Sequence, residues 1–446
     1  MKIRILSVLT ALFCALSVFS LAGCKGKDKN EVYFLNFKPE SASVYEELAE
    51  IYEKETGTAV KVVTAAANNY EQTLKSEIAK SSAPTIFQVN GPVGYSSWKD
   101  YCLDIKDSKL YSYLSDQSLA IKEGDGVYAI PYVVEGYGII YNDAIMRKYF
   151  ALGNKKTDLT SAQQIESFEQ LKAVVEDMTA NLDKLGIKGV FASTSLTTGE
   201  DWRWQTHLLN VPLYQEFFEK DADSDVALSL LNAKEIGYKY YKNFENIFDL
   251  YVNNSVTPKT LLGSKSVADS MAEFALGQAA MVQNGNWAWS QISGVSGNTV
   301  KQEDIKMLPI YMGLEGEKGQ GICIGTENYF AINRNASEEQ QKNSLAFLEW
   351  LFSSETGKKY VTEKLGFITP FKTFSESELP NDPLAKEISR YMSDNAIKNI
   401  PWSFTAFPSE AFKKDVGSAL LEYVQGTKKW EDVRKIISDK WKSERG

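Results

Sequence analysis

The sequence predicts an α/β protein of two domains, with a parallel sheet that helices cover. With 446 residues, the chain is longer than one hydrophobic core usually accommodates, which predicts two domains. From residue 31 onward, strand-like and helix-like segments alternate with short links, as in a parallel sheet that helices cover. The extended run 126–142 contains Pro131 and Gly136, which one continuous strand would not hold comfortably. We interpret this run as a crossing of the chain from one domain to the other.

The first 24 residues have the pattern of an export signal that ends in a cysteine. Lys2 and Arg4 precede an apolar stretch, and the tetrapeptide LAGC ends at Cys24. This tetrapeptide resembles the bacterial lipobox, which implies cleavage before Cys24 and a lipid on that cysteine. We therefore expect a signal peptide over 1–23, a lipidated tether over 24–30, and a protein anchored by this lipid to the outer face of the cell membrane. A plain secretory signal and an uncleaved membrane anchor are the alternatives.

The segment after the tether alternates strands and helices in regular order. Strand patterns occupy 31–37, 58–65 and 84–89, and helix patterns occupy 41–56 and 69–81. In parallel sheets, ligands gather at the loops beyond the carboxyl ends of the strands. The polar residues at these ends are Asn36, Lys38, Gln88 and Asn90.

The rest of the chain is mostly helical, and strands return once. Residues 143–298 contain several amphipathic helix patterns, and strand character returns at 304–312 and 327–334. Ser337 and Gln340 then have capping-box spacing at the start of a long helix pattern, and further helix patterns close the chain.

Composition and motifs disfavour several classes of function. The formal net charge of −9 disfavours a nucleic-acid partner and a polybasic membrane-binding surface. The sequence has no motif of a nucleophilic hydrolase, a zinc protease or a phosphate-binding loop, and its single histidine, His207, lies in a helix pattern typical of a structural residue. We therefore expect no catalytic activity, no cofactor and no metal. Cys102 and Cys323 could form a disulfide or remain two isolated thiols.

A short stretch in the middle of the chain combines indoles and amides. The small apolar run 279–282 ends in the turn sequence QNGN, and Trp287 and Trp289 follow. A sugar presents C–H groups on one ring face and hydroxyls around its rim, so flat aromatic faces and amide groups together suit it. We expect Asn284, Asn286 and Trp287 to point outward from the strand end, and Trp289 to belong to the core.

The segment FALGQAAMVQNGNWAWSQI resembles the signature of the sugar-binding proteins of bacterial ABC importers, most closely the maltose/maltodextrin-binding branch. The matching positions are Phe274, Gly277, Ala280, Met281, Gly285 and Trp287. Three further segments, 131–142, 305–361 and 365–371, are similar in the same order to the family's first interdomain crossover, its re-entry into the first domain and its exit.

This resemblance implies the two-lobed fold of periplasmic binding proteins, with sugar held between the lobes and a hinge of several crossing segments. The first lobe is expected to comprise 31–135 and 300–370. The second lobe is expected to comprise 136–299 and 371–446.

The resemblance also implies which residues bind the sugar. Trp287 corresponds to an indole that stacks on the sugar, and Trp202 corresponds to a second stacking aromatic residue. Glu135 falls on a carboxylate that binds sugar hydroxyls at the hinge. Asn36 and Lys38 fall on the first-strand loop, which contacts sugar from the other lobe.

The chain departs from the maltose branch at two places. After the third strand, the branch carries an adjacent Asp-Arg pair, whereas this chain has Gly91 and Pro92. Near the C-terminus the branch's aromatic doublet is absent, and Trp402 or Phe407 could substitute for it. These departures concern the identity of the sugar and leave a di- or oligosaccharide as the predicted class. Three further residues complete the expected ligand-binding set: Asn90, Asn286 and Trp402.

The expected function is that of a lipid-anchored receptor that captures a di- or oligosaccharide and delivers it to the permease subunits of an ABC transporter. We expect a monomer that contacts the membrane only through the lipid on Cys24. An exported glycoside hydrolase is one alternative, because the sequence holds many carboxylates. A receptor for a non-sugar solute is the other.

Overall fold

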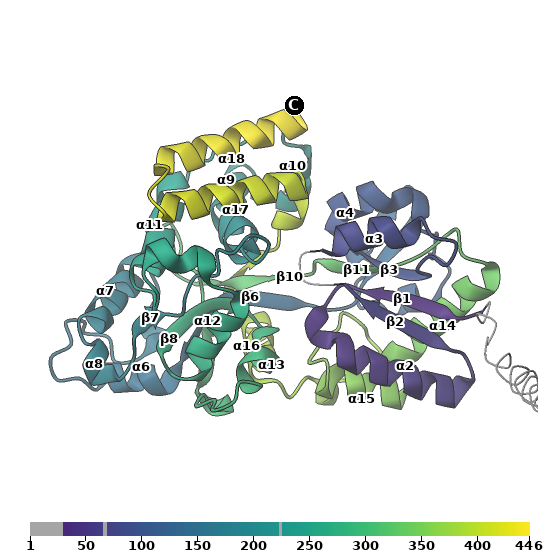
Figure 1. The fold of residues 1–446 in the computed structure, drawn as a ribbon, viewed down its shortest axis with the longest axis horizontal. Coiled ribbons are helices and arrows are strands. Elements are labelled where there is room, and N and C mark those ends of the chain that lie inside the picture. Colours follow the sequence, from purple (N-terminus) through teal and green to yellow (C-terminus); the bar gives the residue numbers. More distant parts are fainter. Residues whose placement is uncertain (1–29, 66–68, 223–224) are drawn as a thin grey trace, which may run out of the picture.

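A computed structural model gives the fold and describes residues 30–65, 69–222 and 225–446. The expected signal peptide at 1–23, the expected lipid site at Cys24 and almost all of the expected tether lie outside these residues. Two six-stranded sheets, each flanked by helices, form two lobes along the long axis of the molecule (Figure 1). The structure therefore confirms the predicted α/β architecture.

The first lobe is built on a sheet with the strand order β2-β1-β3-β11-β5-β4. Its strands are β1 (Val32–Asn36), β2 (Val60–Thr64), β3 (Ile86–Asn90), β4 (Ile121–Glu123), β5 (Gly126–Pro131) and β11 (Asn328–Ile332). Its helices are α2 (Ala42–Thr56), α3 (Tyr70–Ile78), α4 (Gly91–Trp98), α5 (Lys109–Tyr113), α14 (Glu338–Ser353) and α15 (Glu355–Glu363). β1 pairs in parallel with β2 and β3, as the alternation predicted, whereas β11 runs antiparallel to β3 and β5.

β1 shows why this sheet is covered on both faces. Val32 and Phe34 pack in one buried hydrophobic cluster, and Tyr33 and Leu35 pack in another. Successive side chains of a strand point to opposite faces, so the two clusters are the two sides of the sheet. Because both faces of the strand are covered by apolar clusters, its one polar side chain, Asn36, stands at the carboxyl end.

The second lobe is built on a sheet with the order β12-β10-β6-β8-β7, and β9 also pairs with β6. Its strands are β6 (Glu135–Asn142), β7 (Gly189–Phe191), β8 (Ala279–Gly285), β9 (Ile305–Leu308), β10 (Gln320–Gly325) and β12 (Lys398–Pro401). The helices of its first half are α6 (Asp143–Phe150), α7 (Phe168–Thr179), α8 (Leu182–Leu185), α9 (Leu209–Lys220), α10 (Val226–Asn232) and α11 (Tyr241–Asn253). The later helices are α12 (Val267–Ala275), α13 (Ala288–Ser293), α16 (Pro383–Ser393), α17 (Glu410–Val424) and α18 (Trp430–Arg445).

Three crossings of the chain connect the lobes. The first runs from β5 to β6, and the second runs from β10 to β11. The third follows α15 and leads to α16, and in its first part Ile368 pairs with Val134 of the first crossing. Figure 1 shows that β6 and β10 lie at the side of the second lobe that faces the strands of the first.

The positions of these crossings differ from the boundaries expected at 300 and 371. β9 and β10 follow residue 300 but pair with β6 in the second sheet, and Phe371 pairs with Leu114 in the first lobe. A strand pattern shows that a segment is extended but not which sheet it joins, because the same apolar strand fits either. We therefore propose that the chain re-enters the first lobe at 326–327 and leaves it after Glu378, which still pairs with Lys358 on α15.

Two further findings concern the cysteines and the membrane. Cys102 and Cys323 are both buried and free, the first packed in a core cluster of the first lobe and the second on β10. In the described parts of the chain, no helix combines the length and the apolar character needed to cross a bilayer.

Candidate functional site

The predicted site residues lie at the ends of strands where the two lobes meet. β1 and β3 contribute their carboxyl ends from the first lobe, and β8 contributes its carboxyl end from the second. Asn286 fixes the turn after β8 against the hinge through two hydrogen bonds of 3.0 Å to Gly136. Its side-chain Oδ1 accepts from the Gly136 N–H, and its backbone N–H donates to the Gly136 carbonyl. Asn286 is therefore a positioning residue for the side chain that follows it.

Trp287 lies directly over the last residue of β8. A Cβ atom on Gly285 would come within 2.1 Å of Cη2 of the indole, so only glycine leaves room for the ring. The Trp287 side chain is half-buried, and its Nε1–H is shielded from solvent without a hydrogen-bond partner among the described residues. Leaving such a donor unpaired costs about 1–3 kcal/mol, which a bound acceptor would remove.

Trp287 belongs to an aromatic cluster on the second lobe, formed with Trp202, His207, Trp402 and Phe404. Its ring centroid lies 5.8 Å from that of Trp202 and 6.3 Å from that of Trp402. The His207 ring lies 4.8 Å from Trp202, and Phe404 packs 5.2 Å from Trp402. The fold thus brings together the three tryptophans predicted to face the ligand, from three distant parts of the chain.

His207 fills the base of this cluster. Its ring is buried and stacks on Tyr137 with 4.1 Å between centroids and 4° between planes. Burial, with the nearby cations Arg203, Lys413 and Lys38, holds the pKa of this imidazole well below its usual value. The histidine is therefore neutral at neutral pH, which agrees with the structural role that its helix pattern predicted.

Lys38 and Glu135 form a buried ion pair between the lobes. Lys38 Nζ lies 2.8 Å from Glu135 Oε1, and the two side chains are 7% and 3% exposed. Burial raises the pKa of the Glu135 carboxyl, and the Lys38 ammonium opposes that rise. Burial alone would lower the pKa of Lys38, but Glu135 and Glu40 hold it above its usual value. The two predicted ligand-binding residues thus bind each other and connect the loop after β1 to the start of β6.

Asn36 shapes the loop that presents Lys38. Its Nδ2 donates to the Lys38 carbonyl at 2.8 Å and to Thr64 Oγ1 at 3.1 Å, while its Oδ1 accepts from the Lys38 N–H at 3.1 Å. The residue is fully buried. Asn36 thus orients the loop from within the first lobe, and its direct contact with the ligand stays a prediction.

Glu327, in the crossing from β10 to β11, is a site residue that sequence reasoning missed. Burial raises the pKa of its carboxyl, and Lys413, Asn90 and Lys38 oppose the rise. The Gly91 N–H donates to the Glu327 carbonyl at 2.9 Å, which holds this crossing against the start of α4. No local motif surrounds Glu327, so only the pairing of β11 with β3 places it near Asn90.

Several buried polar atoms at this junction lack a hydrogen-bond partner in the described residues. Besides Trp287 Nε1, they include Trp402 Nε1, Asn90 Oδ1 and Thr326 Oγ1. Folded proteins rarely leave buried polar atoms unpaired, so a concentration of them indicates a place for a bound molecule or for water. Three of these four atoms belong to residues predicted from sequence to contact the ligand.

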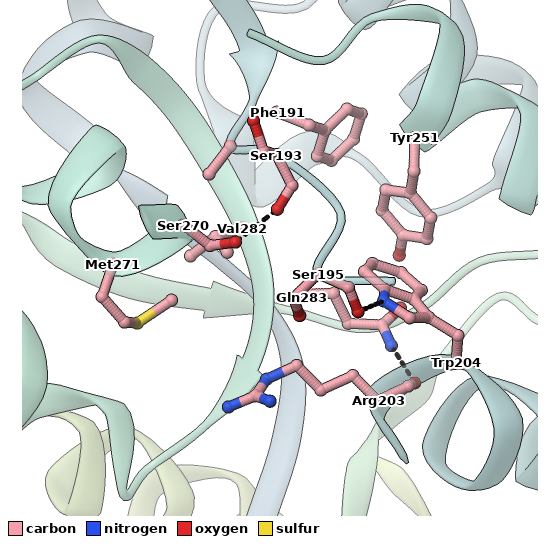
Figure 2. Close-up of a pocket in the computed structure, with 11 residues that line it drawn as sticks. Phe191, Ser193, Ser195, Arg203, Trp204, Tyr251, Ser270, Met271, Val282 and Gln283 are labelled. Carbon is pink, nitrogen blue, oxygen red and sulfur yellow. Dashed lines mark hydrogen bonds between the residues drawn. The ribbon is translucent and has the colours of Figure 1, made fainter. Parts of the chain in front are cut away.

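A small cavity inside the second lobe is a separate feature (Figure 2). Its volume is about 10 Å³, which suits a single water molecule and not a sugar. Its wall is held by hydrogen bonds, among them one from the Trp204 Nε1–H to the Ser195 carbonyl at 3.2 Å. The lining residues are Phe191, Ala192, Ser193, Ser195, Arg203, Trp204, Tyr251, Ser270, Met271, Val282 and Gln283.

The chain was compared with known protein families and with curated proteins. The model of the family described as bacterial extracellular solute-binding protein matches residues 47–387. A search of curated proteins found no match.

Solved structures of similar fold cover nearly the whole chain. RafE from Streptococcus pneumoniae in its apo form is 18% identical, with a TM-score of 0.66 over 93% of this chain and 98% of that one. Maltose-bound MalE3 of T. maritima is 14% identical, with a TM-score of 0.67 over 93% and 99%. The sugar transporter BL01359 from Bacillus licheniformis, in complex with stachyose, is 16% identical, with a TM-score of 0.67 over 93% and 99%. At these identities the likeness establishes the fold.

Proposed function

Because the chain belongs to the bacterial extracellular solute-binding protein family, we propose that it captures a di- or oligosaccharide between its two lobes. The captured sugar is delivered to the permease subunits of an ABC importer. Similar structures that hold raffinose, maltose and stachyose support this class of ligand.

The observation that carries the proposal is the aromatic cluster with its unpaired N–H groups at the lobe junction. Trp287 and Trp202 offer flat faces for the C–H side of a sugar ring. The unpaired donors of Trp287 and Trp402 and the unpaired acceptor of Asn90 offer hydrogen bonds to its hydroxyls. These groups come from both lobes, so a sugar bound to all of them would connect the lobes.

The mechanism is binding that favours one arrangement of the lobes. A sugar that touches both lobes stabilises the arrangement in which they are close, and the permease then recognises that arrangement. Each stacked ring and each buried hydrogen bond contributes about 1 kcal/mol. Micromolar affinity corresponds to about −8 kcal/mol, so several such contacts must act together.

The family places the protein outside the cytoplasm. We propose the finer location from the sequence, with a lipid on Cys24 that anchors a monomer to the outer face of the cell membrane. An anchor of this kind would keep the receptor near its permease.

Substitution of Trp287 tests the proposed function. Isothermal titration calorimetry with the saccharides that raise the melting temperature of the wild-type protein should show at least tenfold weaker binding for Trp287→Ala, which is about 1.4 kcal/mol. The melting temperature without sugar should change little, because the side chain is half-buried.

Trp289→Ala is the matched control. This neighbouring indole is also half-buried, but it packs against a different hydrophobic cluster. Its removal should leave the affinity unchanged. Equal affinity of the Trp287→Ala variant and the wild type would contradict the proposal, and release of shortened saccharides by the wild type would indicate a hydrolase instead.

A further inference from the structure

We infer that Arg203 forms a subsite for a negatively charged group, so that the captured saccharide carries a carboxylate, as uronic acids do. This inference rests on the proposed function and narrows its class of ligand. Arg203 follows Trp202 directly and begins a short π-helix, Arg203–Leu208, beside the aromatic cluster.

Arg203 is a buried cation without an ion pair in the described residues. Only 3% of its surface is exposed. Its Nε–H donates to the neutral amide oxygen of Asn284 at 3.0 Å, and its Nη1 is shielded from solvent without a partner there. Lys38, the other cation buried to this degree within 30–65, 69–222 and 225–446, meets Glu135 at 2.8 Å. Arg203 has a cation–π contact with the Trp202 ring, but the contrast singles it out as a buried charge without a carboxylate partner in the described residues.

A charge of this kind is costly unless something balances it. Burying an ion without a counter-charge is strongly unfavourable, because the ion loses its hydration. Burial lowers the pKa of Arg203 to about 9, and the charges of Glu200 and Glu40 offset this only in part. A sugar hydroxyl would satisfy the free hydrogen bond but would leave the charge unbalanced. A carboxylate would satisfy both, since the planar guanidinium binds carboxylates with paired hydrogen bonds.

The position of the guanidinium suits a ligand on the aromatic cluster. Its Cζ lies 3.9 Å from the centroid of the Trp202 ring, which in turn contacts Trp287. In Figure 2 the side chain of Arg203 extends away from Tyr251 and Trp204, which line the same small cavity. Glu40 of the first lobe acts on its pKa, so the charge lies within electrostatic reach of that lobe.

The first experiment needs no variant. Calorimetry on the wild-type protein compares two acidic oligosaccharides, α-1,4-trigalacturonate and a glucuronosyl xylotriose, with their methyl esters, which keep the shape and lose the charge. We expect at least one acid to bind at least tenfold more tightly than its ester. The inference is overturned if both esters bind as well as the acids, or if neutral saccharides bind while neither acid does.

Two variants then assign the preference to Arg203. Arg203→Gln keeps a hydrogen-bond donor and removes the charge, so the ratio of acid to ester affinity should fall to about one. Arg203→Lys keeps the charge, so the ratio should stay well above one, and this comparison decides the matter if Arg203→Gln does not fold. An unchanged ratio in Arg203→Gln, or a ratio of one in Arg203→Lys, overturns the assignment.

The outcomes separate this inference from the proposed function. If neutral saccharides bind, Trp287→Ala abolishes that binding, and no acid is preferred over its ester, then the inference about Arg203 is wrong and the proposed function stands. If no saccharide of either kind binds, the proposed function fails together with it.

Discussion

At the scale of single residues, each key side chain at the junction of the lobes is positioned by one neighbouring residue. Gly285 leaves space for Trp287, and Asn36 orients the loop that carries Lys38. Lys38 then meets Glu135 at the start of β6. The contact between Gly285 and Trp287 shapes the surface proposed to bind sugar. The Asn36–Lys38 and Lys38–Glu135 contacts connect that surface to the hinge.

The ion pair predicts a large loss of stability when one partner is removed. Glu135→Gln leaves the Lys38 ammonium buried beside an amide, and breaking a buried pair costs about 3–5 kcal/mol. We expect a loss of about 3 kcal/mol in the free energy of unfolding, measured by urea denaturation, because Glu40 lies 3.8 Å from Lys38 and remains a weaker partner.

The exposed pair of Glu50 and Lys54 supplies the control. These side chains are 76% and 77% exposed and lie 4.0 Å apart, so Glu50→Gln should cost less than about 0.5 kcal/mol. The double variant Lys38→Met/Glu135→Gln should recover part of the lost stability, since the Lys38 ammonium is then no longer buried without its partner. Equal urea midpoints for Glu135→Gln and Glu50→Gln would contradict the structural role of the buried pair.

At the scale of elements, the lobes also touch where α4 meets the short turn Phe404–Ala406. A Cβ atom on Gly91, the first residue of α4, would lie 2.7 Å from the Cβ of Thr405. Gly91 belongs to the first lobe and Thr405 to the second, so the absence of a side chain here lets the lobes approach. Gly91 therefore has a packing role in this chain.

Gly91→Ala should weaken sugar binding without any change to a ligand contact. The added methyl group separates the lobes, and overpacking costs about 1–3 kcal/mol, so we expect affinity to fall at least about fivefold in calorimetry. Gly124→Ala is the matched control, because Gly124 has a similar φ of +58° and nothing near its Cβ position. The variant Gly91→Ala/Thr405→Gly should regain affinity; the same loss in both single alanine variants would show backbone strain as the cause.

At the scale of the whole molecule, the sequence predicted the two-lobed α/β fold and three of the tryptophans that the structure brings together. Local periodicity predicted the α/β segments, and the resemblance to the sugar-binding family supplied the two lobes and the three tryptophans. The lobe boundaries were less predictable, because β9 and β10 have the apolar character of any buried strand yet join the second sheet.

The missed site residues depend on tertiary structure. Glu327 reaches the junction through the pairing of β11 with β3, and no motif marks it. Arg203 stands out only because its burial and its lack of a carboxylate partner are visible in the fold. Asn36 was expected to contact the ligand because it ends a strand, but its side chain bonds Lys38 in the loop after β1 and Thr64 at the end of β2.

The central claim is that a saccharide lies on the Trp287 indole and contacts both lobes at once. A crystal structure of the protein with the saccharide that raises its melting temperature most would test this directly. We expect a sugar ring stacked on Trp287, with hydrogen bonds to residues of the first lobe and of the second. A sugar bound elsewhere, or held by one lobe alone with the Trp287 ring uncovered, would contradict the account.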